Sequence, residues 1–190
     1  MGFSPETEIE DLQAAFRQSA VDVARFLDLI PEAVLNKRPA PGKWSVAECI
    51  AHLNTTGRYV SLEMEKSVNH GFSKKITGNP PFRYGWFNRF FIRYMKPDSD
   101  YKLPSPKLYK PVAGPVFNKA DLSKTYAELQ QQYIGLLDQA KGLDLKRIKV
   151  RSPAMPVLRL SLGACFHAME AHQQRHFKQA QRTSELVKDA

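Results

Sequence analysis

The sequence has little cysteine, and its two cysteines, Cys49 and Cys165, stand far apart in a chain of 190 residues. Such a pair offers neither the clustered spacing of a zinc finger nor the framework of a disulfide-stapled domain. We therefore interpret both as small, buried hydrophobic side chains.

Long apolar runs are also missing. No stretch of about 18 apolar residues occurs, so no membrane-spanning helix is expected. The chain begins MGFSPETEIEDL, which is acidic and lacks the basic start and apolar stretch of a secretory leader. Together these absences predict a cytoplasmic protein.

Alternation of apolar and polar residues, the pattern of half-buried strands, is nearly absent, and there is no internal repeat or low-complexity tract. Apolar side chains instead recur at spacings of three, four and seven, which are helical. The composition, 43% hydrophobic and 25% charged, is ordinary for a globular protein. We therefore expect a single all-α domain over residues 1–190.

Four long helices are expected from these stripes and from the residues that begin or end them. The first begins at Ser4 and Pro5 and extends to about residue 30. The second begins at Ser45, where Glu48 three residues later indicates a capping box, and it fades near residues 70–71. The last two are expected over residues 119–140 and 161–187, with residues 143–160 as an extended link.

Residues 72–118 are predicted to form a long, basic and aromatic connection between the second and third long helices. The net charge of the chain is +9, and residues 72–119 hold ten basic and two acidic side chains. An aromatic run predicts a short amphipathic helix at about residues 83–95. Its aromatic and basic side chains are Arg83, Trp86, Phe87, Arg89, Phe90, Phe91, Arg93 and Tyr94.

Four interpretations of this connection stay open. Its aromatic rings could stack on nucleic acid bases, lie on an anionic membrane, or simply pack on the helical bundle while the arginines face water. Alternatively, its positive charge could attract an anionic substrate to an active site. Nucleic acid is disfavoured, because no helix-turn-helix or aromatic strand motif is present.

The residues most informative about chemistry lie in the last helix, where His172 and His176 continue the apolar stripe. Positions four apart diverge by only about 40° around a helix, so these two imidazoles project together. His52 borders the buried stripe of the second helix and completes a set of three if the two helices are neighbours. His167 is about 140° from His172 and should point elsewhere. The pattern predicts a metal site.

Two segments carry a family resemblance. WSVAECIAHL, residues 44–53, and AHQQRHFKQ, residues 171–179, resemble the two signatures of the DinB/YfiT-like superfamily. PKLYKP, residues 106–111, is similar to a segment of the branch with a long connection between helices two and three. The resemblance implies a four-helix bundle with an up-up-down-down course, a divalent ion (zinc, nickel, manganese or iron) on the three histidines, and a homodimer. It also implies, from several branches, a thiol-dependent transferase or isomerase.

An ion on three histidines keeps open positions, which can activate water or a thiol. We therefore predict either a thiol-dependent S-transferase, with a low-molecular-weight thiol as cosubstrate, or a hydrolase. In both cases the substrate is a small molecule, and the basic connection would favour an anionic one. The catalytic candidates are Glu63, which shares the face of His52, and Tyr59; Glu48 is explained by its cap, and Gln179 could support a ligand. The alternative is a non-catalytic protein that binds a small anionic ligand.

Overall fold

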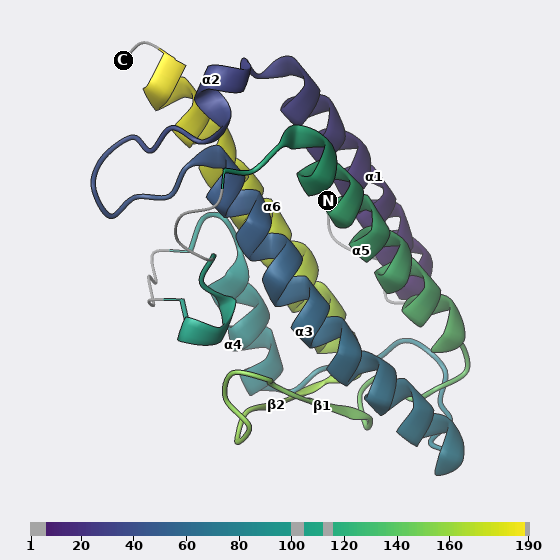
Figure 1. The fold of residues 1–190 in the computed structure, drawn as a ribbon. Helices are drawn as coiled ribbons and strands as arrows, with labels where there is room; N and C mark the ends of the chain where they lie inside the picture. The colour runs from purple at the N-terminus through teal and green to yellow at the C-terminus, as the bar shows by residue number, and fades with distance from the viewer. Residues whose placement is uncertain (1–6, 100–104, 112–115, 189–190) are drawn as a thin grey trace.

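The computed structural model describes residues 7–99, 105–111 and 116–188. Most of them are helical, which confirms the all-α prediction, and four long helices pack along one another (Figure 1). These helices are α1 (Glu8–Leu29), α3 (Val46–Ser73), α5 (Lys119–Gln139) and α6 (Leu162–Lys188). The expected helix start at Ser4 and Pro5 lies outside the described residues. Among the described residues, none of the helices has the length and apolar character that a bilayer crossing requires.

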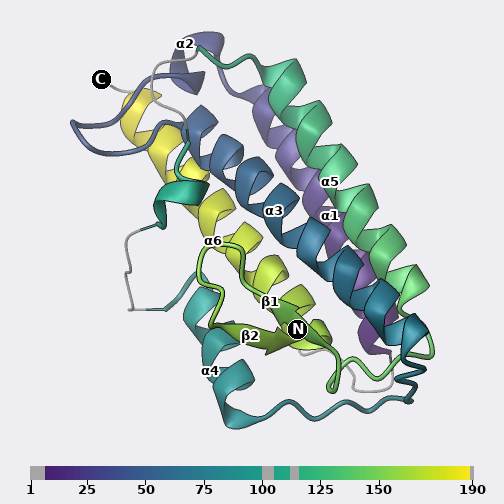
Figure 2. The ribbon, with the colours of Figure 1, turned by 60° about the horizontal axis from the view of Figure 1, so that its bottom comes forward.

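The chain passes through the bundle up, down, down and up, so the expected up-up-down-down course is wrong (Figures 1 and 2). Gln13, early in α1, donates to the carbonyl of Ile134, late in α5, at 3.2 Å, which makes these helices antiparallel. Asn54, early in α3, donates to the carbonyl of Leu122, early in α5, at 3.2 Å, so α3 and α5 are parallel. The physical reason is the connectivity: the link after α1 turns straight back into α3, whereas the long connection returns the chain to the start of α5.

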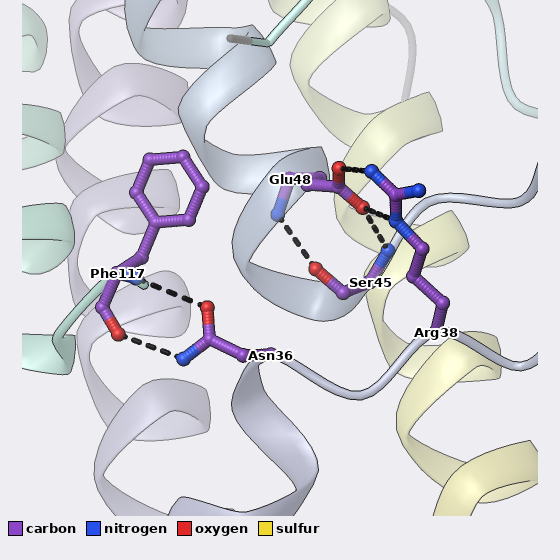
Figure 3. Close-up of polar contacts among 5 residues, drawn as sticks. All are labelled: Asn36, Arg38, Ser45, Glu48 and Phe117. Atoms are coloured by element: carbon purple, nitrogen blue, oxygen red, sulfur yellow. Dashed lines mark hydrogen bonds and ion pairs between the residues drawn. The ribbon is translucent and has the colours of Figure 1, made fainter. Parts of the chain in front are cut away.

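Hydrogen bonds join the link after α1 to the end of the long connection. A short helix, α2 (Glu32–Leu35), follows α1. Just beyond it, the Asn36 side chain donates to the carbonyl of Phe117 at 2.8 Å and accepts from the N–H of Phe117 at 3.0 Å (Figure 3). This pair of hydrogen bonds fixes where the chain enters α5.

The long connection contains two helical pieces, α4 (Trp86–Met95) and the 3₁₀ helix η1 (Lys107–Tyr109). The predicted short helix is therefore present, but it begins three residues later than expected, because Gly85 has extended backbone and forms its N-cap. Figure 2 shows α4 on the outside of the bundle, beside α6. One of its side chains, Phe91, packs inward against the core.

Residues 143–160 are more ordered than the extended link that was expected. Strands β1 (Lys149–Arg151) and β2 (Arg159–Ser161) pair in an antiparallel manner, with Val150 opposite Leu160. Both of these side chains are buried. Strands of three residues are too short to produce a recognisable alternation in the sequence, and this is why the pairing was missed.

The core consists of two clusters of buried apolar side chains, one toward each end of the bundle. The first includes Phe16 and Tyr133, whose rings stack with centroids 4.8 Å apart. Cys49 lies in the second cluster and Cys165 in the first, which confirms both as buried. Burial raises the pKa of each thiol to about 12, so neither is a thiolate at neutral pH.

Candidate metal centre

His52, on α3, meets His172 and His176, on α6. One ring nitrogen from each histidine lies within 4.8 Å of the others. The ring centroids are 5.2 Å apart for His52 and His172, 4.5 Å for His52 and His176, and 4.6 Å for His172 and His176. The predicted convergence is confirmed. His167, on the same helix, points elsewhere as expected, since its Nε2 lies 2.8 Å from the carboxylate of Glu8.

The cluster owes its position to the packing of α3 against α6. His172 and His176 are one turn apart on α6, and His52 lies on the early part of α3 that faces them. Trp44 immediately precedes the cap of α3 and forms an aromatic wall, with its ring centroid 4.8 Å from that of His52 and 5.9 Å from that of His176.

The nitrogen positions fit a divalent metal ion. Nε2 of His52 lies 3.3 Å from Nε2 of His172. Two imidazole nitrogens about 2.1 Å from one tetrahedral ion are themselves about 3.4 Å apart. Nδ1 of His172 is buried and, among the described residues, has no hydrogen-bond partner. The donor set and its spacing therefore suit zinc or a similar ion.

Two neighbouring groups orient the histidine rings. Nδ1 of His52 donates to the carbonyl oxygen of Tyr109, in η1, at 2.6 Å. Nδ1 of His176 donates to Oε1 of Gln179 at 2.9 Å. When Nδ1 carries the proton, the lone pair of Nε2 is available to a metal. The contact considered between Gln179 and a histidine ligand is therefore present. The contact from Tyr109 was not predicted, because a backbone carbonyl leaves no side-chain signature in a sequence.

The environment keeps the three rings neutral. Burial lowers the pKa of His52, although the hydrogen bond to Tyr109 opposes the shift. Burial, together with the neighbouring histidines, lowers the pKa of His172 well below its usual value. For His176, burial and then His52 lower the pKa to about 3. Neutral imidazole is the form that binds a metal, so the cluster is ready to coordinate at neutral pH.

Glu48, close to His52 in sequence, has a structural role in capping α3. Its carboxylate accepts from the Ser45 N–H at 2.9 Å, while its own N–H donates to the Ser45 hydroxyl at 3.2 Å, which is the predicted capping box (Figure 3). Arg38 adds an ion pair to the same carboxylate. Burial alone would raise the pKa of Glu48, but the hydrogen bonds from Arg38 and Ser45 lower it overall. The carboxylate is therefore poorly suited to act as a general base.

The two predicted catalytic side chains occupy different surroundings. Glu63 lies eleven residues after His52 on α3, which corresponds to about 16 Å along a helix. Its carboxylate accepts from Lys66 at 2.5 Å. Tyr59 is 40% exposed, and its ring centroid lies 6.3 Å from that of Tyr109, the residue that holds His52. Along α3, Tyr59 is four residues closer to His52 than Glu63 is, and the catalytic role of each stays a prediction.

Comparison with known proteins gives a family. The sequence profile of the DinB superfamily matches residues 15–180, a range that includes all three histidines and both signature segments. No curated protein and no solved structure matches the chain significantly. The profile covers most of the chain, and so this protein belongs to the DinB superfamily.

Proposed function

We propose that the protein is a divalent-metal-dependent enzyme that joins a low-molecular-weight thiol to a small electrophilic substrate. The observation that supports this most is the convergence of His52, His172 and His176, with ring nitrogens within 4.8 Å. Sets of three protein ligands are typical of catalytic zinc, whereas structural zinc has four. When bound, an ion such as zinc, nickel, manganese or iron would deprotonate a coordinated thiol and lower the pKa of coordinated water.

Thiol transfer is favoured over the second predicted reaction, hydrolysis of a small molecule. Metal-assisted hydrolysis generally relies on a positioned acid or base. Glu48 is held by Arg38 and by its cap, and Glu63 is paired with Lys66. A thiol, once deprotonated, is a strong nucleophile without such help.

The residues of the chain have separable roles in this proposal. The three histidines hold the ion, while Tyr109 and Gln179 fix the rings of His52 and His176. Trp44 packs against the rings of His52 and His176. Tyr59 is proposed to donate a hydrogen bond to the substrate. The ten basic and two acidic side chains of residues 72–119 would attract a carboxylate-bearing thiol or another anionic substrate.

The first experiment tests whether the protein binds a divalent metal ion. Protein purified without a nickel column should contain about one divalent ion per chain by elemental analysis, or take one up from added zinc, nickel or manganese. His172→Ala should abolish this uptake. His70→Ala is the matched control, because His70 is exposed near the end of α3 and should leave metal content unchanged. Equal metal content in His172→Ala and wild type would contradict the proposed site.

The reaction is tested next with metal-loaded protein. We expect conjugation of glutathione, bacillithiol or mycothiol to an electrophile such as monochlorobimane, detected by mass spectrometry, and its loss in His172→Ala. Hydrolysis of small esters and amides, measured in parallel, tests the second reaction. Thiol binding without turnover, seen as a thermal shift, would instead support the non-catalytic alternative.

The remaining predictions concern the oligomeric state, cellular location and partners of the protein. A homodimer, a cytoplasmic location and the absence of a nucleic acid partner rest on the sequence and the family resemblance. Light scattering of the purified protein checks the dimer. Cell fractionation checks the location, and gel-shift measurements check nucleic acid binding.

A further inference from the structure

The outer face of α4 presents large aromatic side chains to solvent. Trp86 is 80% exposed, Phe90 48% and Phe87 40%. Phe90 is four positions after Trp86 and three after Phe87, so the three side chains lie within about 100° of one another around the ten-residue helix. An exposed tryptophan beside two exposed phenylalanines is unusual on a protein surface and commonly indicates an interaction site.

Helix α4 is firmly attached to the bundle, so this aromatic face has a fixed position. Asn88 accepts from the N–H of Ser161, in β2, at 2.9 Å. Arg175, on α6, donates to the carbonyl of Tyr94 at 3.0 Å. Phe91 packs against the core from the inner side. Figure 2 shows the helix lying alongside α6, with its length exposed on the outside of the molecule.

The positive charge of this face favours an anionic partner. Arg83, Arg89 and Arg93 are all exposed, and α4 contains no acidic residue. A second copy of the chain, docked through the same face by a two-fold axis, would bring these arginines against their counterparts. No carboxylate of α4 would compensate that repulsion. Charge complementarity therefore disfavours self-association here.

We propose that the aromatic face of α4 (Trp86, Phe87, Phe90) docks on an anionic phospholipid surface, with Arg89 and Arg93 contacting the headgroups. Tryptophan and phenylalanine on one side of a helix, accompanied by arginine, are the composition of helices that lie in the membrane interface. Single-stranded nucleic acid also uses aromatics and arginine, but it is bound along grooves, whereas α4 lies on the outside of the bundle beside α6 (Figure 2). Anchoring by one short helix is weak and reversible.

The proposal is tested by sedimentation with vesicles of phosphatidylcholine, with and without about one third phosphatidylserine. Wild type should co-sediment with the anionic vesicles alone, and about 0.5 M salt should weaken this binding. Trp86→Ser with Phe87→Ser, and separately Arg89→Gln with Arg93→Gln, should each lower the partition coefficient at least about tenfold. Circular dichroism checks that the variants fold.

Two controls remove an exposed apolar side chain or two exposed charges from α1, which lies apart from α4 in both ribbon views (Figures 1 and 2). Leu29→Ser alters an exposed apolar side chain, and Arg17→Gln with Arg25→Gln removes two exposed charges. Both should bind vesicles as wild type does. Equal loss in these controls, or no binding by wild type, would overturn the proposal. Binding of a single-stranded oligonucleotide without vesicle binding would also overturn it, and would assign the face to nucleic acid.

Fluorescence supplies a second measurement. Brominated phospholipids should quench the emission of Trp86 on binding, because bromine quenches only indole rings that reach the acyl region. The Trp86→Phe variant retains an aromatic ring and should still sediment with vesicles, but it should lose the quenching. Binding without any quenching in wild type would show that α4 does not enter the interface. None of these residues belongs to the metal centre, so metal content tests the proposed enzyme separately from vesicle binding.

Discussion

The Nδ1 atom of His52 lies 2.6 Å from the carbonyl oxygen of Tyr109, a residue 57 positions away in the chain. This hydrogen bond directs the other ring nitrogen, Nε2, toward His172. The hydroxyl of Tyr109 in turn accepts from the N–H of Ala154, in the loop between β1 and β2, at 3.2 Å. The long connection and the strand pair therefore both contribute to the orientation of one histidine of the metal centre.

The Tyr109→Phe variant tests that linkage. It removes the hydroxyl that Ala154 contacts but retains the carbonyl that His52 contacts, so we expect metal affinity to fall by up to about tenfold. Competition with a chelating dye measures the affinity. Tyr84→Phe is the matched control, because it also removes a tyrosine hydroxyl, here one that donates to Glu8. It should lower stability without changing metal affinity, and a similar affinity loss in both variants would contradict a specific role for Tyr109.

Gln179 is expected to affect metal affinity by orienting the ring of His176. Gln179→Ala removes the acceptor of the His176 Nδ1 proton, and loss of such a partner typically lowers metal affinity about 10- to 100-fold. The same dye competition measures the change. Gln174→Ala alters a neighbouring glutamine that bonds Glu170 and should leave the affinity unchanged. An unaltered affinity in Gln179→Ala would show that the ring of His176 is oriented by other contacts.

The metal-free protein should lose stability in acid. Burial lowers the folded-state pKa of His52, His172 and His176, the last to about 3, whereas an unfolded histidine titrates near 6.5. Below pH about 6.5 the unfolded chain therefore binds more protons than the folded chain. The free energy of unfolding then falls by up to about 1.4 kcal/mol per pH unit for each histidine, and this loss continues until the folded-state pKa is reached.

Urea unfolding at several pH values between about 7.5 and 5 measures this dependence. His172→Gln removes one of the three groups and should have a shallower pH dependence than wild type. His70→Ala, which alters an exposed histidine, should keep the dependence of wild type. Identical slopes in His172→Gln and wild type would mean that His172 does not resist protonation in the folded protein.

Turnover measurements on variants distinguish the proposed roles of Tyr59 and Glu63. Because Tyr59 lies beside Tyr109, we expect Tyr59→Phe to lower kcat by about tenfold or more with unchanged metal content. Glu63 lies about 16 Å along the helix from His52 and is paired with Lys66, so Glu63→Gln should retain most of the activity. The reverse order of effects would identify Glu63 as the functional side chain.

Several features were predictable because they depend on local spacing. The capping box of Ser45 and Glu48 and the inward projection of His172 and His176 follow from positions three and four apart on a helix. The strand pair around Val150 and the course of the helices were not predictable in this way. Both depend on contacts between segments distant in the chain, for which short patterns carry little information.

The four long helices, the short helix α4 and the three inward imidazoles could be predicted from the sequence, because the periodicity of a helix appears in residues that are close together in the chain. The packing of the helices, in contrast, brings His52 to 3.3 Å from His172 and places a backbone carbonyl where it orients the ring. It also decided that Trp86 faces solvent while Phe91 faces the core. These outcomes depend on how whole helices pack, and packing minimises free energy over the entire chain rather than within any one segment.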